Sequence, residues 1–113
     1  MQQTLGDSEG GMGARWRRQT LHAKYLQHCL DFRPHPERRQ IVREEDYERS
    51  SLETVREGVE FAYTDRTSGD PRVGYFDPLT ECFTAVTVDR QWIITHYPAT
   101  EDYVRSLPDS DYA

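Results

Sequence analysis

The amino-acid sequence predicts an α+β fold in which two N-terminal helices pack on one face of a four-stranded antiparallel sheet, a meander. Three observations support this prediction. Apolar residues follow helical spacing as far as position 58, and short alternating segments separated by turn residues come after it. The length of 113 residues fits one small domain.

The first helix is predicted within residues 14–32. At 100° per residue, five of its apolar residues fall on an arc of about 140°. These are Leu21, Tyr25, Leu26, Cys29 and Phe32. His22 lies inside this arc, and His28 lies at its edge beside Lys24. Pro34 and Pro36 end the helix, because proline breaks the helical hydrogen bonds.

A basic connector over residues 35–42 then leads to a second helix over residues 44–58. Three acidic residues open this helix, where they favour the helix dipole, and Gly58 is suited to its C-terminal cap. Tyr47, Leu52 and Val55 are expected on its inner side.

Four strands are predicted over residues 59–63, 72–76, 82–88 and 91–97, because each segment is apolar or alternating and is bounded by turn residues. We therefore expect a flexible leader over residues 1–13 and a single α+β domain over residues 14–100. A C-terminal tail over residues 101–113 is expected to fray beyond one helical turn near Asp102–Leu107.

The charge distribution limits the classes of partner. Residues 1–43 hold eight Lys/Arg and four Asp/Glu, a balance of +4, whereas residues 44–113 hold six and sixteen, a balance of −10. A protein whose main partner is nucleic acid is usually basic overall. RNA could therefore meet only a local basic face here, and the acidic part would repel phosphate.

No apolar stretch approaches the length of a membrane span, and the N-terminus lacks the apolar core of a secretory signal. These features predict action in the cytoplasm, without a membrane partner. Cys29 and Cys82 are expected to be free thiols. No ligand spacing typical of a metal site and no nucleotide-binding fingerprint is present, so neither a metal nor a cofactor is expected.

The stretch QWIITHYP, residues 91–98, ends an apolar strand with polar residues. Alternation places Ile93, Thr95 and Tyr97 on one face of this strand, and Trp92, Ile94 and His96 on the other. The hydroxyls of Thr95 and Tyr97 could both donate hydrogen bonds to one anionic group. The alternative is that they are ordinary strand residues, since Thr and Tyr are favoured in strands.

A resemblance sharpens this choice. The segment GYFDPLTECFTAVTVDRQWIITHYP, residues 74–98, resembles the last strands of bacterial ribonuclease toxin domains of the barnase, EndoU, colicin D and RelE-like group. Their aromatic-Asp-Pro-x-Thr turn is matched by Phe76, Asp77, Pro78 and Thr80. The RNase A-like branch, of the CdiA toxin type, combines a helix histidine, an arginine about eleven residues later and Thr-x-Tyr before Pro. His28, Arg39 and Thr95–Pro98 follow that order.

The resemblance implies a metal-independent endoribonuclease, in which a ribose 2′-hydroxyl attacks the adjacent phosphate. His28 would remove the hydroxyl proton, Arg39 would stabilise the phosphate charge, and Thr95 and Tyr97 would donate hydrogen bonds to it. Lys24 and Arg38 would contact phosphate, and Trp92 would stack on a base unless it is buried in the core. RNA and a cognate immunity or antitoxin protein would be the partners.

The residues themselves leave open one alternative catalytic base and two alternative functions. His22 competes with His28 for the role of the base, whereas His35 has no visible partner. The same scaffold could also be a non-catalytic module that binds a basic protein through its acidic surface. An enzyme acting on another phosphorylated substrate is a third reading, which no nucleotide-binding motif supports.

Overall fold

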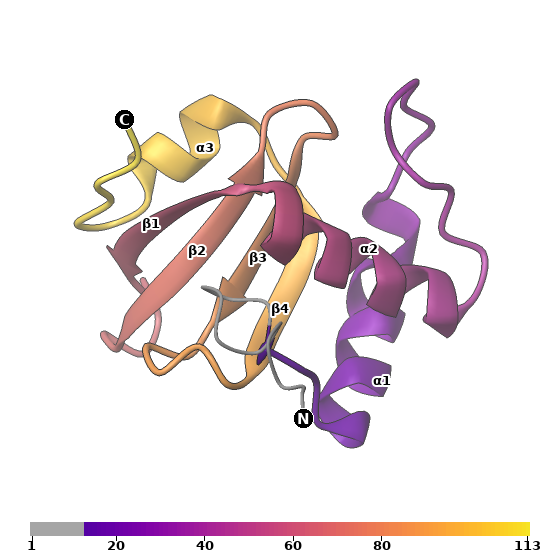
Figure 1. The fold of residues 1–113 in the computed structure, drawn as a ribbon, viewed down its shortest axis with the longest axis horizontal. Coiled ribbons are helices and arrows are strands. Elements are labelled where there is room, and N and C mark those ends of the chain that lie inside the picture. The colour runs from indigo at the N-terminus through magenta and orange to yellow at the C-terminus, as the bar shows by residue number, and fades with distance from the viewer. Residues whose placement is uncertain (1–12) are drawn as a thin grey trace, which may run out of the picture.

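The computed structural model describes residues 13–113, so most of the predicted leader lies outside the described residues. The chain is α+β, with a four-stranded antiparallel sheet in the order β1-β2-β3-β4 and three α-helices (Figure 1). The helices are α1 (Arg18–His28), α2 (Glu44–Glu57) and α3 (Glu101–Ser106), and the short 3₁₀-helix η3 (Cys29–Asp31) continues α1. The strands are β1 (Val59–Thr64), β2 (Pro71–Asp77), β3 (Cys82–Val86) and β4 (Ile93–Pro98).

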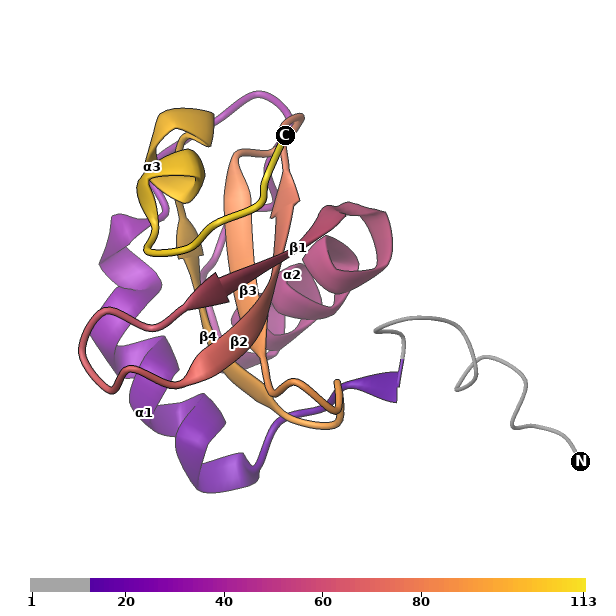
Figure 2. The ribbon, with the colours of Figure 1, turned by 90° about the vertical axis from the view of Figure 1, so that its left-hand side faces the viewer.

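The helices surround the sheet on three sides. Helix α2 crosses one face, α1 runs along the edge formed by β4, and α3 lies on the opposite face (Figures 1 and 2). The predicted fold class and strand order are confirmed, and both N-terminal helices contribute to the same core. The prediction gave α3 only as one helical turn in a fraying tail, and it placed the first helix on a face of the sheet rather than at its edge.

The core on the α2 face combines both N-terminal helices with three strands. It is built from Trp16, Leu21, Tyr47, Val55, Val73, Tyr75, Val86 and Ile93. Tyr47 and Val55 are buried as expected, but Leu26 and Leu52 are exposed by 61% and 37%. Leu26 points to solvent because a helix lying along a strand edge has only a narrow buried stripe.

The opposite face carries a second core that α3 and the C-terminal segment cover. Phe61, Phe76, Phe83 and Val104 belong to it, and Tyr112 packs against it. Gly74 makes room for this core, because a Cβ at that position would lie 2.6 Å from the Phe61 ring and 2.9 Å from the Phe83 ring. The helical turn expected near Asp102–Leu107 is present, but the segment that follows it is held by the domain.

Both sheet edges are partly covered by segments outside the four strands. Residues 108–111 bond to β1, where the amide of Thr64 donates to the carbonyl of Pro108 and the amide of Asp111 donates to that of Ala62. At the other edge, Arg15 forms a parallel bridge with Trp92. These contacts give hydrogen-bond partners to main-chain groups at the sheet edges, which could otherwise pair with strands of other molecules. No helix among residues 13–113 is long and apolar enough to cross a membrane.

A bulge changes the alternation along β4. The register shifts between Ala85 and Val86, because Val86 pairs with Ile93 whereas Ala85 pairs with Thr95. Ile94 is the extra residue, so Ile93 joins the core on the α2 face. Thr95 and Tyr97 do share a face opposite to His96, as predicted, but Ile93 is not on that face.

Candidate functional site

The end of β4 meets the end of α1 on both faces of the sheet edge. On one face, the ring of Tyr97 lies 5.0 Å from the imidazole of His28, centroid to centroid. On the other, the ring of Phe32 lies 5.2 Å from the imidazole of His96. Helix α1 supplies His28 because it follows the edge strand, and Phe32 comes directly after η3. The structure therefore brings together two predicted site residues, His28 and Tyr97, which are 69 positions apart in the chain.

His28 is held by a neighbouring carboxylate. Its Nδ1 lies 3.0 Å from Oδ2 of Asp31, in the turn that continues α1. A carboxylate only accepts hydrogen bonds, so the Nδ1–H donates and the neutral ring keeps a lone pair on Nε2. The side chain is 14% exposed, so it keeps limited contact with solvent. The sequence analysis missed Asp31, although a carboxylate three residues after a helix histidine is a recognisable signal.

The hydroxyl of Tyr97 contacts a second tyrosine. Its oxygen lies 2.7 Å from that of Tyr103 on α3, and either group can be the donor. Burial, followed by this hydrogen bond, raises the pKa of Tyr97 far above its ordinary value. Tyr97 therefore stays protonated at neutral pH, and it can donate a hydrogen bond but cannot act as a base.

Thr95 lies on the same face as Tyr97 but deeper. It is 8% exposed, and its Oγ1 has no hydrogen-bond partner within the described residues. A buried hydroxyl without a partner is uncommon in native proteins and calls for an explanation.

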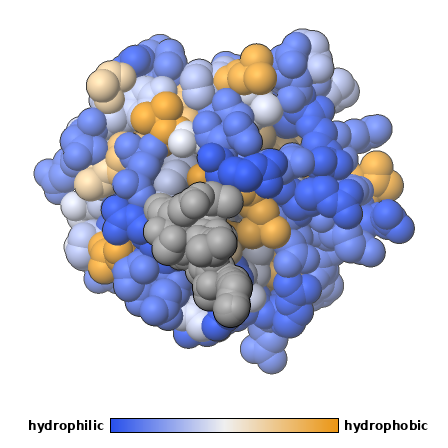
Figure 3. All heavy atoms as spheres, viewed as in Figure 1, coloured by the Kyte–Doolittle hydropathy of each residue, from blue (hydrophilic) through white to orange (hydrophobic). Residues whose placement is uncertain are grey.

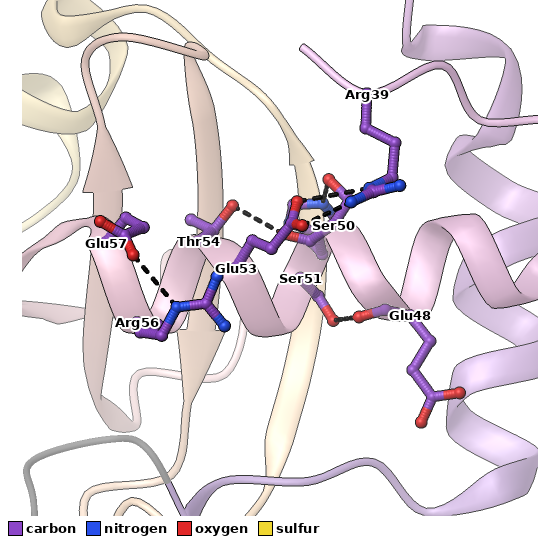
Figure 4. Close-up of polar contacts among 9 residues, drawn as sticks. Arg39, Glu48, Ser50, Ser51, Glu53, Thr54, Arg56 and Glu57 are labelled. Carbon is purple, nitrogen blue, oxygen red and sulfur yellow. Dashed lines mark hydrogen bonds and ion pairs between the residues drawn. The ribbon is translucent and has the colours of Figure 1, made fainter.

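Arg39 is not brought to His28 and Tyr97. Its guanidinium forms a two-pronged ion pair with Glu53 of α2, with Nη2 2.5 Å from Oε2 and Nε 3.3 Å from Oε1. Figure 4 shows this side chain reaching from the connector onto α2, beside Ser50. That is the α2 face of the sheet, whereas Tyr97 points to the other face.

The three predicted substrate-binding residues have separate surroundings. Arg38 donates from Nε to the carbonyl of Thr80 and from Nη1 to that of Arg33. Lys24 contacts only the side-chain oxygen of Gln27, at 3.4 Å. The ring of Trp92 is covered by guanidinium groups, that of Arg17 at 3.9 Å and that of Arg15 at 5.0 Å, so it is not a free stacking surface.

The other two histidines of the N-terminal region face carboxylates of later elements. His22, the alternative base, is 62% exposed and its Nδ1 lies 2.8 Å from Glu44 Oε1. His35 accepts from the amide of Glu37 at Nδ1, so its Nε2–H donates to Glu81. Neither ring is in aromatic contact with β4 within the described residues, which separates both from His28.

His96 is the centre of a buried polar network. Its Nδ1 donates to the carbonyl of Phe83 at 3.1 Å and lies 2.8 Å from Oγ1 of Thr84. With Nδ1 carrying the proton, Nε2 accepts from the hydroxyl of Ser50 at 2.9 Å. Burial lowers the pKa of His96 to about 3, so the ring is neutral and a poor base. The expectation that it is a weaker candidate than its neighbours is consistent with this environment.

Within residues 13–113, no group of three or more His, Cys, Asp or Glu side chains is arranged to hold a metal ion. No protein-family model, curated protein or solved structure matches this chain. A functional assignment therefore depends on the chain's own residues.

Proposed function

We propose that the protein is a metal-independent endoribonuclease of the bacterial toxin type, which cleaves RNA by attack of a ribose 2′-hydroxyl on the adjacent phosphate. The observation that carries the proposal is the contact between His28 and Tyr97. A helix histidine held by a carboxylate lies against a protonated tyrosine on the last strand. A base beside a hydrogen-bond donor is what this transesterification requires.

In this mechanism, Nε2 of His28 removes the proton from the 2′-hydroxyl while Asp31 keeps the imidazole oriented. The oxygen attacks phosphorus, a cyclic phosphate forms, and the 5′-oxygen of the next nucleotide leaves with a proton taken from water. Tyr97 donates to a phosphate oxygen, and Tyr103 supports it by donating to its oxygen. Thr95 would supply a second donor, a role that fits its unpartnered hydroxyl. Arg39 would have to leave Glu53 and the α2 face of the sheet to reach this phosphate, whose oxygens match the same guanidinium fork as the carboxylate does.

A non-catalytic interaction module is the second candidate, and one set of observations favours it. Tyr97 already has a hydrogen-bond partner, Thr95 is buried, and Arg39 is bound to Glu53. Under this alternative, the three side chains stabilise the fold and the protein leaves RNA intact.

Cleavage of RNA in EDTA separates the two candidates. We expect the purified protein to degrade total RNA, and His28→Ala to lower the rate by about 10²-fold or more, because a positioned base contributes about 10²–10⁴-fold. His22→Ala is the matched control on the same helix and should retain activity. Unchanged cleavage by the His28 variant, or an inactive wild type, would count against the enzyme.

Tyr97→Phe and Tyr103→Phe form a second matched pair, because each removes the same hydroxyl–hydroxyl bond. We expect the first to lose at least about 10-fold more activity than the second, since only Tyr97 would reach the phosphate. Equal losses would indicate a structural role. Thermal unfolding of both variants checks that they fold equally.

A further inference from the structure

An open cavity of about 580 Å³ lies between the end of α1 and the connector that leads to α2. Among the residues that line it are Leu30, Phe32, Arg33, His35, Arg38 and Ile41. Its volume falls in the range of small-ligand sites, about 300–1,000 Å³. Nothing in the mechanism above uses this cavity.

The cavity has positive charges that no carboxylate neutralises. The guanidinium of Arg33 makes no hydrogen bond or ion pair within residues 13–113, and that of Arg38 donates only to main-chain carbonyls. Arg39 also lines the cavity, but its charge is matched by Glu53. Glu81 lies nearby and accepts from His35, but neither Arg33 nor Arg38 forms an ion pair with a carboxylate among residues 13–113. An anionic group would find two cations there.

The same cavity exposes apolar surface. Leu30 is 91% exposed, and Ile41 and Phe32 are partly buried. The guanidinium carbon of Arg38 lies 5.9 Å from the centre of the Phe32 ring. Planar guanidinium groups and aromatic rings are surfaces on which nucleobases stack, and an exposed aliphatic side chain adds apolar contact. The chemistry that fits both features is an anionic group next to a flat apolar body.

The cavity is also close to the proposed cleavage site. Phe32 is one helical turn beyond His28, and the two rings contact neighbouring residues of β4, His96 and Tyr97. A single-stranded RNA that crosses the edge of the sheet at β4 could therefore place adjacent nucleotides at the cavity and at the contact between His28 and Tyr97.

We propose that this cavity binds one nucleotide of single-stranded RNA next to the cleaved phosphodiester, with Arg33 and Arg38 on its phosphate and Leu30 under its base. The inference rests on the proposed function and adds a substrate subsite to it. It also explains how a chain of net charge −6 could bind RNA, because two arginines without an ion-pair partner among residues 13–113 line the same cavity.

The test measures binding without cleavage. A fluorescein-labelled 2′-O-methyl RNA octamer has no attacking hydroxyl, and its affinity for the full chain is read by anisotropy over a range of salt concentrations. We expect Arg33→Gln to weaken binding by about 5–10-fold and to lower the salt slope by about 0.7, as the loss of one phosphate contact does. Arg56→Gln, the same charge change on an exposed residue of α2, should alter affinity by less than about 2-fold.

A second pair tests the base contact. Leu30→Ser should weaken octamer binding by about 3-fold or more and leave the salt slope unchanged, because it removes apolar surface that would cover the base but removes no charge. Leu79→Ser, at an exposed leucine in the turn between β2 and β3, is the matched control. Both leucines are exposed, so neither change should unfold the protein.

Equal effects of Arg33→Gln and Arg56→Gln, or an octamer that the wild type does not bind, would overturn the inference. If wild type cleaves RNA while the Arg33 variant binds the octamer normally, the subsite is wrong and the proposed function stands. If octamer binding depends on Arg33 but no RNA is cleaved, the cavity stands as a nucleic-acid site and the proposed cleavage is wrong.

Discussion

At the scale of single residues, the hydroxyl of Thr95 offers the sharpest test, because the fold gives it no hydrogen bond within the described residues. Thr95→Val keeps the shape of the side chain and removes an unsatisfied buried polar group. We expect the free energy of unfolding to rise by about 1 kcal/mol, as measured by urea denaturation. Under the proposed function, the same variant should lose RNA cleavage.

Thr84→Val is the matched control on the neighbouring strand. Thr84 Oγ1 lies 2.8 Å from the imidazole of His96, so removing it should lower stability by about 1 kcal/mol. A Thr95 variant that is destabilised like the Thr84 variant would mean that the Thr95 hydroxyl is satisfied in solution. A stabilised variant with full activity would remove Thr95 from the proposed mechanism.

At the scale of elements, α3 and the segment after it are an integral part of the domain. Val104 is fully buried in the core on the face opposite α2, and Thr100 caps the helix by accepting from the amide of Tyr103. Val104→Ala should lower the free energy of unfolding by about 2 kcal/mol, through lost burial and a cavity. Asp102→Ala, at a side chain 99% exposed, should leave stability unchanged. An unchanged stability of the Val104 variant would mean that α3 does not pack on the sheet in solution.

The elements also show which features the sequence could predict. Alternation placed Thr95 and Tyr97 on one face, because strand geometry is local. It could not place Ile93, since the bulge opposite Val86 depends on pairing between strands. The docking of residues 101–113 was missed for a similar reason: its polar composition indicates exposure, whereas three of its residues, Val104, Leu107 and Tyr112, pack on the sheet.

At the scale of the whole molecule, the two charge blocks of the sequence meet in space. Arg18 and His22 of α1, and Arg39 of the connector, pair with carboxylates of α2: Glu48, Glu44 and Glu53. Two of the eight Lys/Arg in residues 1–43 therefore pair with carboxylates of α2. The α2-facing surface in Figure 3 is largely hydrophilic, with hydrophobic residues in small separate patches. Each exposed pair contributes little to stability, about 0–1 kcal/mol. Their main consequence is that the net charge of +4 in residues 1–43 overstates the positive charge available to bind a partner.

The stability of the whole molecule should also depend on the buried imidazole of His96. Its pKa is about 3 in the folded protein and about 6.5 in an unfolded chain, so only the unfolded chain binds a proton between these values. The stabilisation linked to the lowered pKa of His96 is complete above about pH 6.5. It is lost as the pH falls toward 3, by at most about 1.4 kcal/mol per pH unit. Between pH 7 and pH 5 the expected loss is therefore about 2 kcal/mol.

Urea denaturation at pH 7 and pH 5 measures this loss, and His96→Gln isolates it. The other three histidines and their carboxylate contacts are the same in both proteins, so the difference between wild type and variant belongs to His96. The variant should be less stable at pH 7 but should show a flatter pH dependence, because it has no imidazole to protonate on unfolding. If it does not fold, the imidazole proton signals of His96 in the wild type should still show no titration between pH 7.5 and 4.5. Parallel pH profiles, or a titrating His96, would place this ring in contact with water and contradict its position in the core.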